Sequence, residues 1–271
     1  MRYFITTILF LIQCSLYAQE KDDNLNPPEK TLHTPLTKTI FYKLGGSTLP
    51  IKVHQFGDRK DIVFINLHDN ETTSVNAATK ILEEEGGQLI EIENNEQRMI
   101  QFRSGRSVYT FDPNRIFSKE GLTKSLKESG KISPNAIKEV GLLAKRILEL
   151  LPEKPLCIIA LHNNTPDFFS SLSFAAGNDR NKDARKVYIN PDEDADDFFF
   201  TTDAYLYEEL ANKKFNIILQ DNMNCSDDGS LSVYCGKKNI RYVNCETEHG
   251  KTDQYYKMMT ALVTVLPSEK F

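Results

Sequence analysis

Histidine and glutamate side chains that could share a metal ion follow two apolar runs of the chain. His68 and Glu71 form a His-x-x-Glu motif shortly after the run Ile62–Asn66. His162 directly follows a second run, Cys157–Leu161. Two histidines and one glutamate, with an open fourth position, form a known catalytic zinc set. His162 alone is better explained as a hydrogen-bonded strand end, but the three residues together predict a site for one Zn²⁺ ion per chain.

An arginine-containing segment lies between these two groups. Arg106 precedes the sequence Asp112-Pro-Asn114-Arg115-Ile-Phe. A guanidinium group binds a carboxylate through two hydrogen bonds, and a neighbouring amide can complete the contact. Each arginine alone is better explained by ordinary surface salt bridges. Together with Asn114, the segment predicts a site for an anionic group of a substrate.

A third apolar run, Ile240–Cys245, is followed directly by Glu246. A carboxylate at that position could accept a proton from water and pass it to a leaving group. Glu248 lies two residues further on, so an extended backbone would point both side chains to the same face. Alternation therefore leaves both glutamates open, and we favour Glu246 because it directly ends the run.

Strand and helix patterns alternate along most of the chain and would position these side chains. Strands are predicted at Thr39–Tyr42, Ile51–Gln55, Ile62–Asn66, Gln88–Glu93, Cys157–Leu161, Val187–Ile189, Ile217–Leu219 and Ile240–Asn244. Helices are predicted at Ser74–Glu85, Ser133–Leu151, Thr202–Lys213 and Thr252–Leu266. This alternation predicts a single α/β domain with a mostly parallel or mixed twisted sheet and helices on both faces. Such sheets bind ligands at the carboxyl ends of their strands, where the candidate residues lie.

The N-terminus has the pattern of a secretory signal peptide. Arg2 precedes the apolar run Phe4–Ile12, and Ala18 offers a small residue for cleavage. The run is too short to span a bilayer, so we expect residues 1–18 to be removed and no transmembrane segment to remain. We expect a secreted or periplasmic protein. Lipid attachment at Cys14 is the minor alternative.

Residues 19–36 are polar and rich in proline, which predicts a flexible linker before a catalytic domain spanning residues 37–271. The net charge of −5 and the pI of about 5.6 argue against a nucleic-acid partner. In an oxidising compartment, Cys225 and Cys235 could close a small disulfide loop around a polar turn. Cys157 and Cys245 lie in apolar runs and are expected to be buried thiols.

The order of these motifs resembles the zinc carboxypeptidase superfamily, including its succinylglutamate desuccinylase and aspartoacylase branch. The matching segments are His68-Asp-Asn-Glu71, Arg106 through Asp112-Pro-Asn114-Arg115-Ile-Phe, Leu161-His162-Asn163 and the strand ending at Glu246. The resemblance implies a zinc carboxypeptidase-like fold and a role for each candidate: zinc binding by His68, Glu71 and His162, oxyanion stabilisation by Arg106, carboxylate binding by Asn114 and Arg115, general base catalysis by Glu246, and a place in the side-chain pocket for Leu231.

The resemblance implies a zinc-dependent metallohydrolase that cleaves an amide bond near a substrate carboxylate. Only 25 residues follow Glu246 in the sequence, so the C-terminal domain that narrows the aspartoacylase site is not expected. That favours a small peptide or a muropeptide from peptidoglycan as substrate over an N-acyl amino acid, although an aspartoacylase-like deacylase stays open. A non-catalytic cell-wall or peptide-binding module that retains the fold is the alternative from another functional class.

Overall fold

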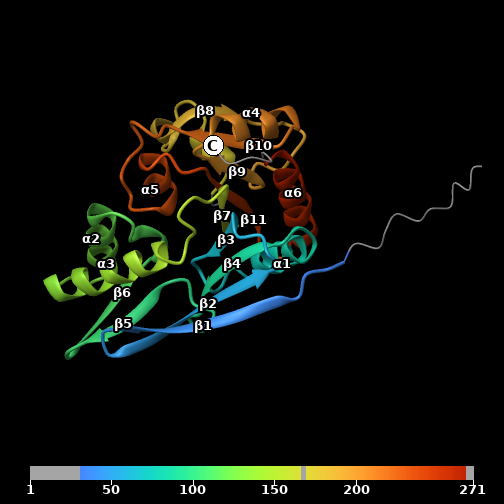
Figure 1. The fold of residues 1–271 in the computed structure, drawn as a ribbon. Helices are drawn as coiled ribbons and strands as arrows, with labels where there is room; N and C mark the ends of the chain where they lie inside the picture. The colour runs from blue at the N-terminus through green and yellow to red at the C-terminus, as the bar shows by residue number, and fades with distance from the viewer. Residues whose placement is uncertain (1–30, 166–168, 267–271) are drawn as a thin grey trace, which may run out of the picture. The chain divides into compact units, whose positions relative to one another are not determined.

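A nine-stranded mixed sheet forms the centre of the computed structural model, which describes residues 31–165 and 169–266 (Figure 1). The strand order is β1-β2-β4-β3-β7-β11-β9-β10-β8. The strands of this sheet are β1 (Pro35–Leu44), β2 (Ser47–Phe56), β3 (Ile62–Asn66), β4 (Gly87–Ile92), β7 (Cys157–Asn164), β8 (Ala184–Tyr188), β9 (Phe198–Thr201), β10 (Asn216–Gln220) and β11 (Tyr242–Glu248).

The four central strands β4, β3, β7 and β11 run parallel, so their carboxyl ends meet at one edge of the sheet. On either side, β2 and β9 pair antiparallel to this group. Every residue of β3 and β7 is buried, as expected for strands covered on both faces. The predicted α/β class with a mixed sheet is therefore confirmed.

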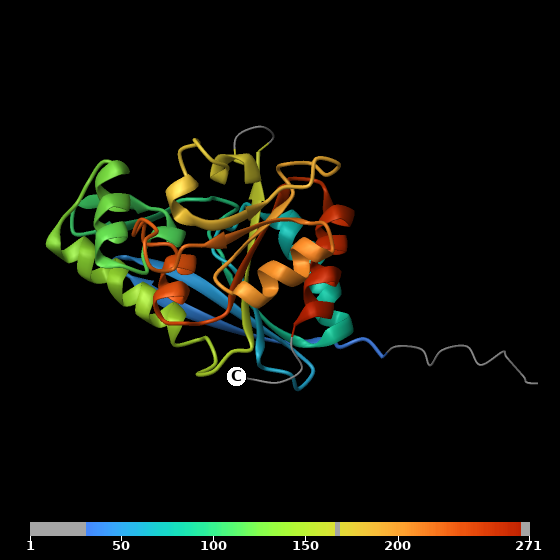
Figure 2. The same cartoon turned by 90° about the horizontal axis from the view of Figure 1, so that it is seen from above.

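Helices cover both faces of the sheet (Figure 2). They are α1 (Thr72–Glu85), α2 (Lys119–Glu128), α3 (Pro134–Leu148), α4 (Ala204–Asn212), α5 (Leu231–Lys237) and α6 (Thr252–Val265). One hydrophobic core lies between the sheet and α1, α4 and α6, and the other lies under α2, α3 and α5. Phe64 of β3 contributes to the first core, whereas Val63 and Ile65 contribute to the second, because successive side chains of a strand point to opposite faces.

Several boundaries differ from the sequence prediction. The predicted signal peptide and residues 19–30 of the predicted linker lie outside the described residues. β1 begins at Pro35, inside the range assigned to the linker, because it pairs with β2 over its whole length. The β5–β6 hairpin (Ile100–Ser104 and Ser107–Phe111) was not predicted, nor were α2, α5 and β9. None of the described helices is long and apolar enough to cross a membrane.

The four cysteines in the described part of the chain are free thiols. Cys157, Cys235 and Cys245 are buried, and Cys225 is partly exposed. The disulfide that the sequence allowed between Cys225 and Cys235 is therefore absent. Cys235 lies on α5 with its side chain in the hydrophobic core, so it does not face the polar turn. The expectation of buried thiols at Cys157 and Cys245 agrees with the structure.

Candidate metal centre

Three predicted metal ligands converge at the carboxyl edge of the parallel strands. His68 and Glu71 lie in the turn between β3 and α1, and His162 lies near the end of the neighbouring strand β7. The Nδ1 atoms of the two histidines are 3.2 Å apart. Glu71 Oε1 lies 3.2 Å from His68 Nδ1, and Glu71 Oε2 lies 2.9 Å from His162 Nδ1. All three side chains are buried.

This geometry fits a tetrahedral metal ion. Zinc bonds to nitrogen and oxygen ligands measure about 2.0–2.2 Å, which places two ligands of one tetrahedral ion roughly 3.4 Å apart. The observed separations of 2.9–3.2 Å are close to that value. Three protein ligands leave one position open for water or substrate, as in catalytic zinc sites. His68, Glu71 and His162 can therefore hold such an ion.

The turn that carries His68 and Glu71 is held by local hydrogen bonds. The side chain of Asn66 accepts a hydrogen bond from the His68 backbone N–H at 3.1 Å. The Glu71 N–H donates to the carbonyl of His68 at 3.0 Å, and the Ser74 hydroxyl donates to the carbonyl of Glu71 at 2.6 Å. These bonds fix the directions of both ligands before α1 begins, so the site is organised by its own sequence neighbourhood.

Asp112 orients His68 from the side away from the other ligands. Its Oδ1 lies 2.8 Å from His68 Nε2 and also accepts the backbone N–H of Asn114 at 2.8 Å. A carboxylate at Nε2 keeps the proton on that nitrogen and leaves the Nδ1 lone pair for a metal ion. This contact was not predicted from the sequence, where Asp112 was only part of the Asp-Pro-Asn-Arg motif. Its signal was the Asp-Pro-Asn sequence, in which the aspartate caps a short 3-10 helix at Pro113–Arg115.

The charges of the site favour ionised carboxylates at Glu71 and Asp112. Burial alone would raise the pKa of Glu71, but the imidazoles of His68 and His162 outweigh it and hold that pKa well below its usual range. The His68 imidazole and neighbouring arginines likewise lower the pKa of Asp112 against the effect of burial. Both carboxylates are thus negatively charged at neutral pH, as a cation site requires.

Glu246 lies next to His162 on the adjacent parallel strand. The two residues are register partners in the pairing of β11 with β7. Burial is the main cause that raises the pKa of the Glu246 carboxyl above its ordinary value, while a hydrogen bond of 2.9 Å from Asn244 Nδ2 opposes that shift. Glu248, the competing candidate, forms an ion pair with Lys251 at 2.9 Å. Of the two glutamates, only Glu246 is the register partner of His162.

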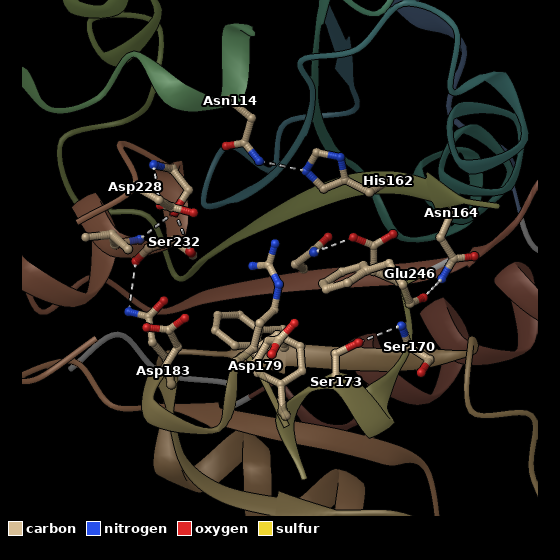
Figure 3. Close-up of a pocket in the computed structure, with 18 of the residues that line it drawn as sticks. Asn114, His162, Asn164, Ser170, Ser173, Asp179, Asp183, Asp228, Ser232 and Glu246 are labelled. Atoms are coloured by element: carbon tan, nitrogen blue, oxygen red, sulfur yellow. Dashed lines mark hydrogen bonds between the residues drawn. The ribbon is translucent and has the colours of Figure 1, made fainter. Parts of the chain in front are cut away.

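A cavity of about 940 Å³ contains these groups. Glu71, Asn114, Arg115, His162 and Glu246 all line it, whereas Glu248 does not. Figure 3 shows Asn114 reaching His162 from one side of the cavity, with Ser170, Ser173 and Asp179 on the opposite side. The Asn114 Nδ2 atom lies 3.3 Å from His162 Nε2. A substrate in this cavity would thus contact the metal ligands and the predicted carboxylate-binding residues together.

Arg106 does not reach the cavity, contrary to the sequence prediction. It lies in the exposed turn of the β5–β6 hairpin and is not among the cavity-lining residues. Arg98 lines the cavity instead, with Nη1 against Glu71 Oε1 and Nη2 at 3.9 Å from Asp112 Oδ2. The hairpin carries Arg106 away because its two strands extend the backbone between Ile100 and Phe111.

The loop between β3 and α1, which carries His68 and Glu71, also holds the turn before Arg98. Asp69, between His68 and Glu71 in sequence, accepts the backbone N–H groups of Asn94 at 2.6 Å and Glu96 at 2.8 Å. Asn95 and Glu96 adopt left-handed φ angles of 53° and 58°, which cost energy outside glycine. The position after β4, a third parallel strand end, is the signal that could have identified Arg98.

Of two further predicted residues, Arg115 lines the cavity whereas the side chain of Leu231 does not. The Arg115 guanidinium lies 3.3 Å from Asp228 Oδ2 and donates to the carbonyl of Asn114 at 2.9 Å. Leu231 is fully buried in the hydrophobic core, so its side chain does not line the cavity. Only its backbone N–H contacts the site, donating to Asn114 Oδ1 at 3.1 Å. Ser230 and Ser232, its sequence neighbours, line the cavity in its place.

Tyr255 of α6 links β7 and β11, the strands that carry His162 and Glu246. Its buried hydroxyl donates to the carbonyl of Cys245 at 2.6 Å and accepts the backbone N–H of His162 at 3.2 Å. Cys245 directly precedes Glu246, so one hydroxyl fixes the backbone beside both His162 and Glu246. No feature of the sequence analysis marked this tyrosine.

Comparisons with known proteins give matches only among solved structures. No protein-family model matches the sequence, and no curated protein does. The chain is similar to the murein-tripeptide amidase MpaA from Escherichia coli O157 at 14% identity, covering 90% of this chain and 98% of that one with a TM-score of 0.47. It is also similar to an aspartoacylase family protein from Mesorhizobium loti at 14% identity, covering 88% and 68% with a TM-score of 0.45.

Proposed function

We propose that this protein is a zinc-dependent hydrolase that cleaves an amide bond next to a carboxylate of its substrate. The observation that carries the proposal is the convergence of His68, Glu71 and His162 on one point, with Glu246 in the same cavity. The ligand set matches the preferences of zinc. The buried carboxylic acid beside it favours an enzyme over a binding module, because binding alone does not require a proton acceptor.

The chain supplies two groups for the chemistry, the Glu246 carboxyl and the Arg98 guanidinium, beside the site for a zinc ion. A zinc ion at the site would act as a Lewis acid that acidifies water and polarises a carbonyl group. Glu246 accepts the proton of the attacking water and returns it to the leaving amine, and its raised pKa suits it to both transfers. Arg98 takes the role expected of Arg106, because its positive charge lies at the metal site. A hydrogen-bond donor at a developing oxyanion lowers the activation free energy by about 3–4 kcal/mol.

Asn114 and Arg115 position the substrate in this proposal. Both line the cavity, and Arg115 is held there by an ion pair with Asp228 at 3.3 Å. A carboxylate bound there would hold the adjacent amide near His162 and Glu246. Fixing the amide in this orientation would lower the activation free energy of hydrolysis. We propose small peptides or peptidoglycan stem peptides as substrates, in keeping with the export that the N-terminus predicts.

Metal content and hydrolysis test this function separately. We expect one zinc ion per chain by elemental analysis, and hydrolysis of at least one member of a muropeptide and peptide panel, followed by mass spectrometry. Glu246→Gln should keep the zinc and lose turnover, whereas Glu248→Gln, a matched change on the same strand, should keep both. A wild-type protein that binds zinc stoichiometrically but cleaves nothing in the panel would favour the binding module.

Export is a separate part of the proposal. Cleavage after Ala18 would give a mature chain that begins at Gln19. Mass spectrometry of the protein from culture medium or periplasm would identify that N-terminus. An N-terminus at a lipid-modified Cys14 would replace the soluble form with the anchored one, and an intact Met1 would contradict export.

A further inference from the structure

We infer that Arg180 binds a second anionic group of the substrate, so that the preferred substrate carries at least two acidic groups. This inference rests on the proposed function, because it assigns the substrate class of the same cavity. Arg180 lies between η2 (Ser171–Phe174) and β8, in the segment that follows β7, and it lines the cavity together with Asn114 and Arg115.

Arg180 differs from the other arginines of the cavity in its partners. Arg98 contacts the Glu71 carboxylate, and Arg115 lies 3.3 Å from Asp228. Among residues 31–165 and 169–266, no carboxylate oxygen lies within 4.0 Å of the Arg180 side-chain nitrogens. Its half-buried guanidinium therefore retains its hydrogen-bonding capacity for a group that enters the cavity.

The surrounding structure holds this guanidinium in place. Its central carbon lies 4.9 Å from the centre of the Phe169 ring, and that ring packs edge-on against Phe174 and Phe198. The Arg180 backbone N–H donates to the carbonyl of Ser173 at 3.1 Å. Stacking on an aromatic face occupies the plane of the guanidinium but leaves its N–H edges available, and these edges bind carboxylates in a bidentate manner.

The nearby acidic residues do not neutralise Arg180. Asp179 and Asp183 also line the cavity, but neither forms an ion pair with it. Asp183 Oδ1 accepts the backbone N–H of Ser226 at 2.8 Å, which directs that carboxylate elsewhere. In Figure 3, Asp179 lies across the cavity from Asn114. A substrate in this cavity would therefore meet Arg180 as a cationic group in addition to Asn114 and Arg115.

Dicarboxylates provide a probe that does not depend on catalysis. We would titrate the zinc-loaded protein by calorimetry with glutarate and adipate, each compared with its half-amide, glutaramate or adipamate. The half-amides keep the length of the acids but lose one charge and one of the two acceptor oxygens that a guanidinium binds. We expect at least one diacid to bind about tenfold more tightly than its half-amide in the wild-type protein. Arg180→Gln should abolish this preference, and Arg180→Lys should retain part of it.

Arg106→Gln is the matched control, because it removes the same charge from an arginine outside the cavity and should leave the preference unchanged. An equal preference in wild type and Arg180→Gln would overturn the inference, and so would the absence of any preference in the wild type. A peptide panel then separates the two proposals. If nothing is cleaved but the diacid preference still depends on Arg180, the hydrolase proposal fails and the second anion site stands.

Discussion

Replacing Asp112 with asparagine tests whether the His68–Asp112 contact prepares the metal site. Asp112 is ionised at neutral pH because His68 lowers its pKa, so the change removes one negative charge 2.8 Å from His68 Nε2. The amide oxygen can still accept the N–H of Asn114, which preserves the local turn. Partners of this kind contribute about tenfold to a hundredfold to metal affinity, which corresponds to about 1.4–2.8 kcal/mol.

Zinc affinity can be measured by competition with a chromophoric chelator. We expect Asp112→Asn to weaken zinc binding by about tenfold, near the lower end of that range, because the acceptor is kept. Asp112→Ala removes the acceptor as well and should approach a hundredfold. Asp228→Asn is the control, since it removes the same charge from the cavity wall at Arg115, away from the ligands. If both asparagine variants bind zinc as the wild type does, the orienting role of Asp112 is refuted.

Three further changes test other contacts of the site. Asn244→Ala removes the hydrogen bond that stabilises the ionised Glu246 carboxylate, so the pKa of Glu246 should rise further. The acid limb of the pH profile of kcat/KM should then move to higher pH, and an unchanged pH profile would exclude Glu246 as the titrating base. Tyr255→Phe deletes a buried hydroxyl with two backbone partners and should lower the free energy of unfolding in urea by about 1–3 kcal/mol, and an equally stable variant would mean that those bonds contribute nothing. Asp69→Ala frees the turn before Arg98 and should lower kcat/KM by up to about a hundredfold while the zinc content stays at the wild-type level. If the variant loses its zinc, Asp69 acts instead by holding the turn that carries His68 and Glu71.

The central elements of the fold were predictable because local signals mark them. β3 begins and ends at the predicted residues, Ile62 and Asn66, since a short apolar run between polar residues is typical of a strand buried on both faces. The Ser133-Pro134 pair marked the start of α3, where the Ser133 hydroxyl accepts the N–H of Ala136 at 3.1 Å. β9 was not predicted because it directly follows an acidic segment that was assigned to a loop, and its pairing with β10 and β11 is long-range.

The candidate site was predictable where a ligand follows its own strand. His68 and His162 follow apolar runs that became adjacent parallel strands, so the strand-end rule placed them together. Arg98 and Arg106 lie on either side of the β5 strand, and the sequence prediction chose Arg106 although only Arg98 follows the parallel strand β4 without an intervening strand. The position of Arg98 depends on the Asp69 contact with the turn before it, which joins two segments about 25 residues apart in sequence.

The choice between Glu246 and Glu248 shows why alternation alone could not complete the site. Both side chains point to the same face of β11, so the alternation of residues along the strand does not distinguish them. The pairing register separates them, because Glu246 lies opposite His162 whereas Glu248 lies opposite Asn164. A parallel strand rises about 3.3 Å per residue, so Glu248 lies roughly 6.6 Å further along the strand from the metal ligand. Glu248 forms an ion pair with Lys251 there, and of the two glutamates only Glu246 lines the cavity. Shifting the register of β11 by two residues would place Glu248 opposite His162 and Glu246 opposite Ala160. Strand pairing, rather than the identity of either glutamate, therefore determines which one can act as the base.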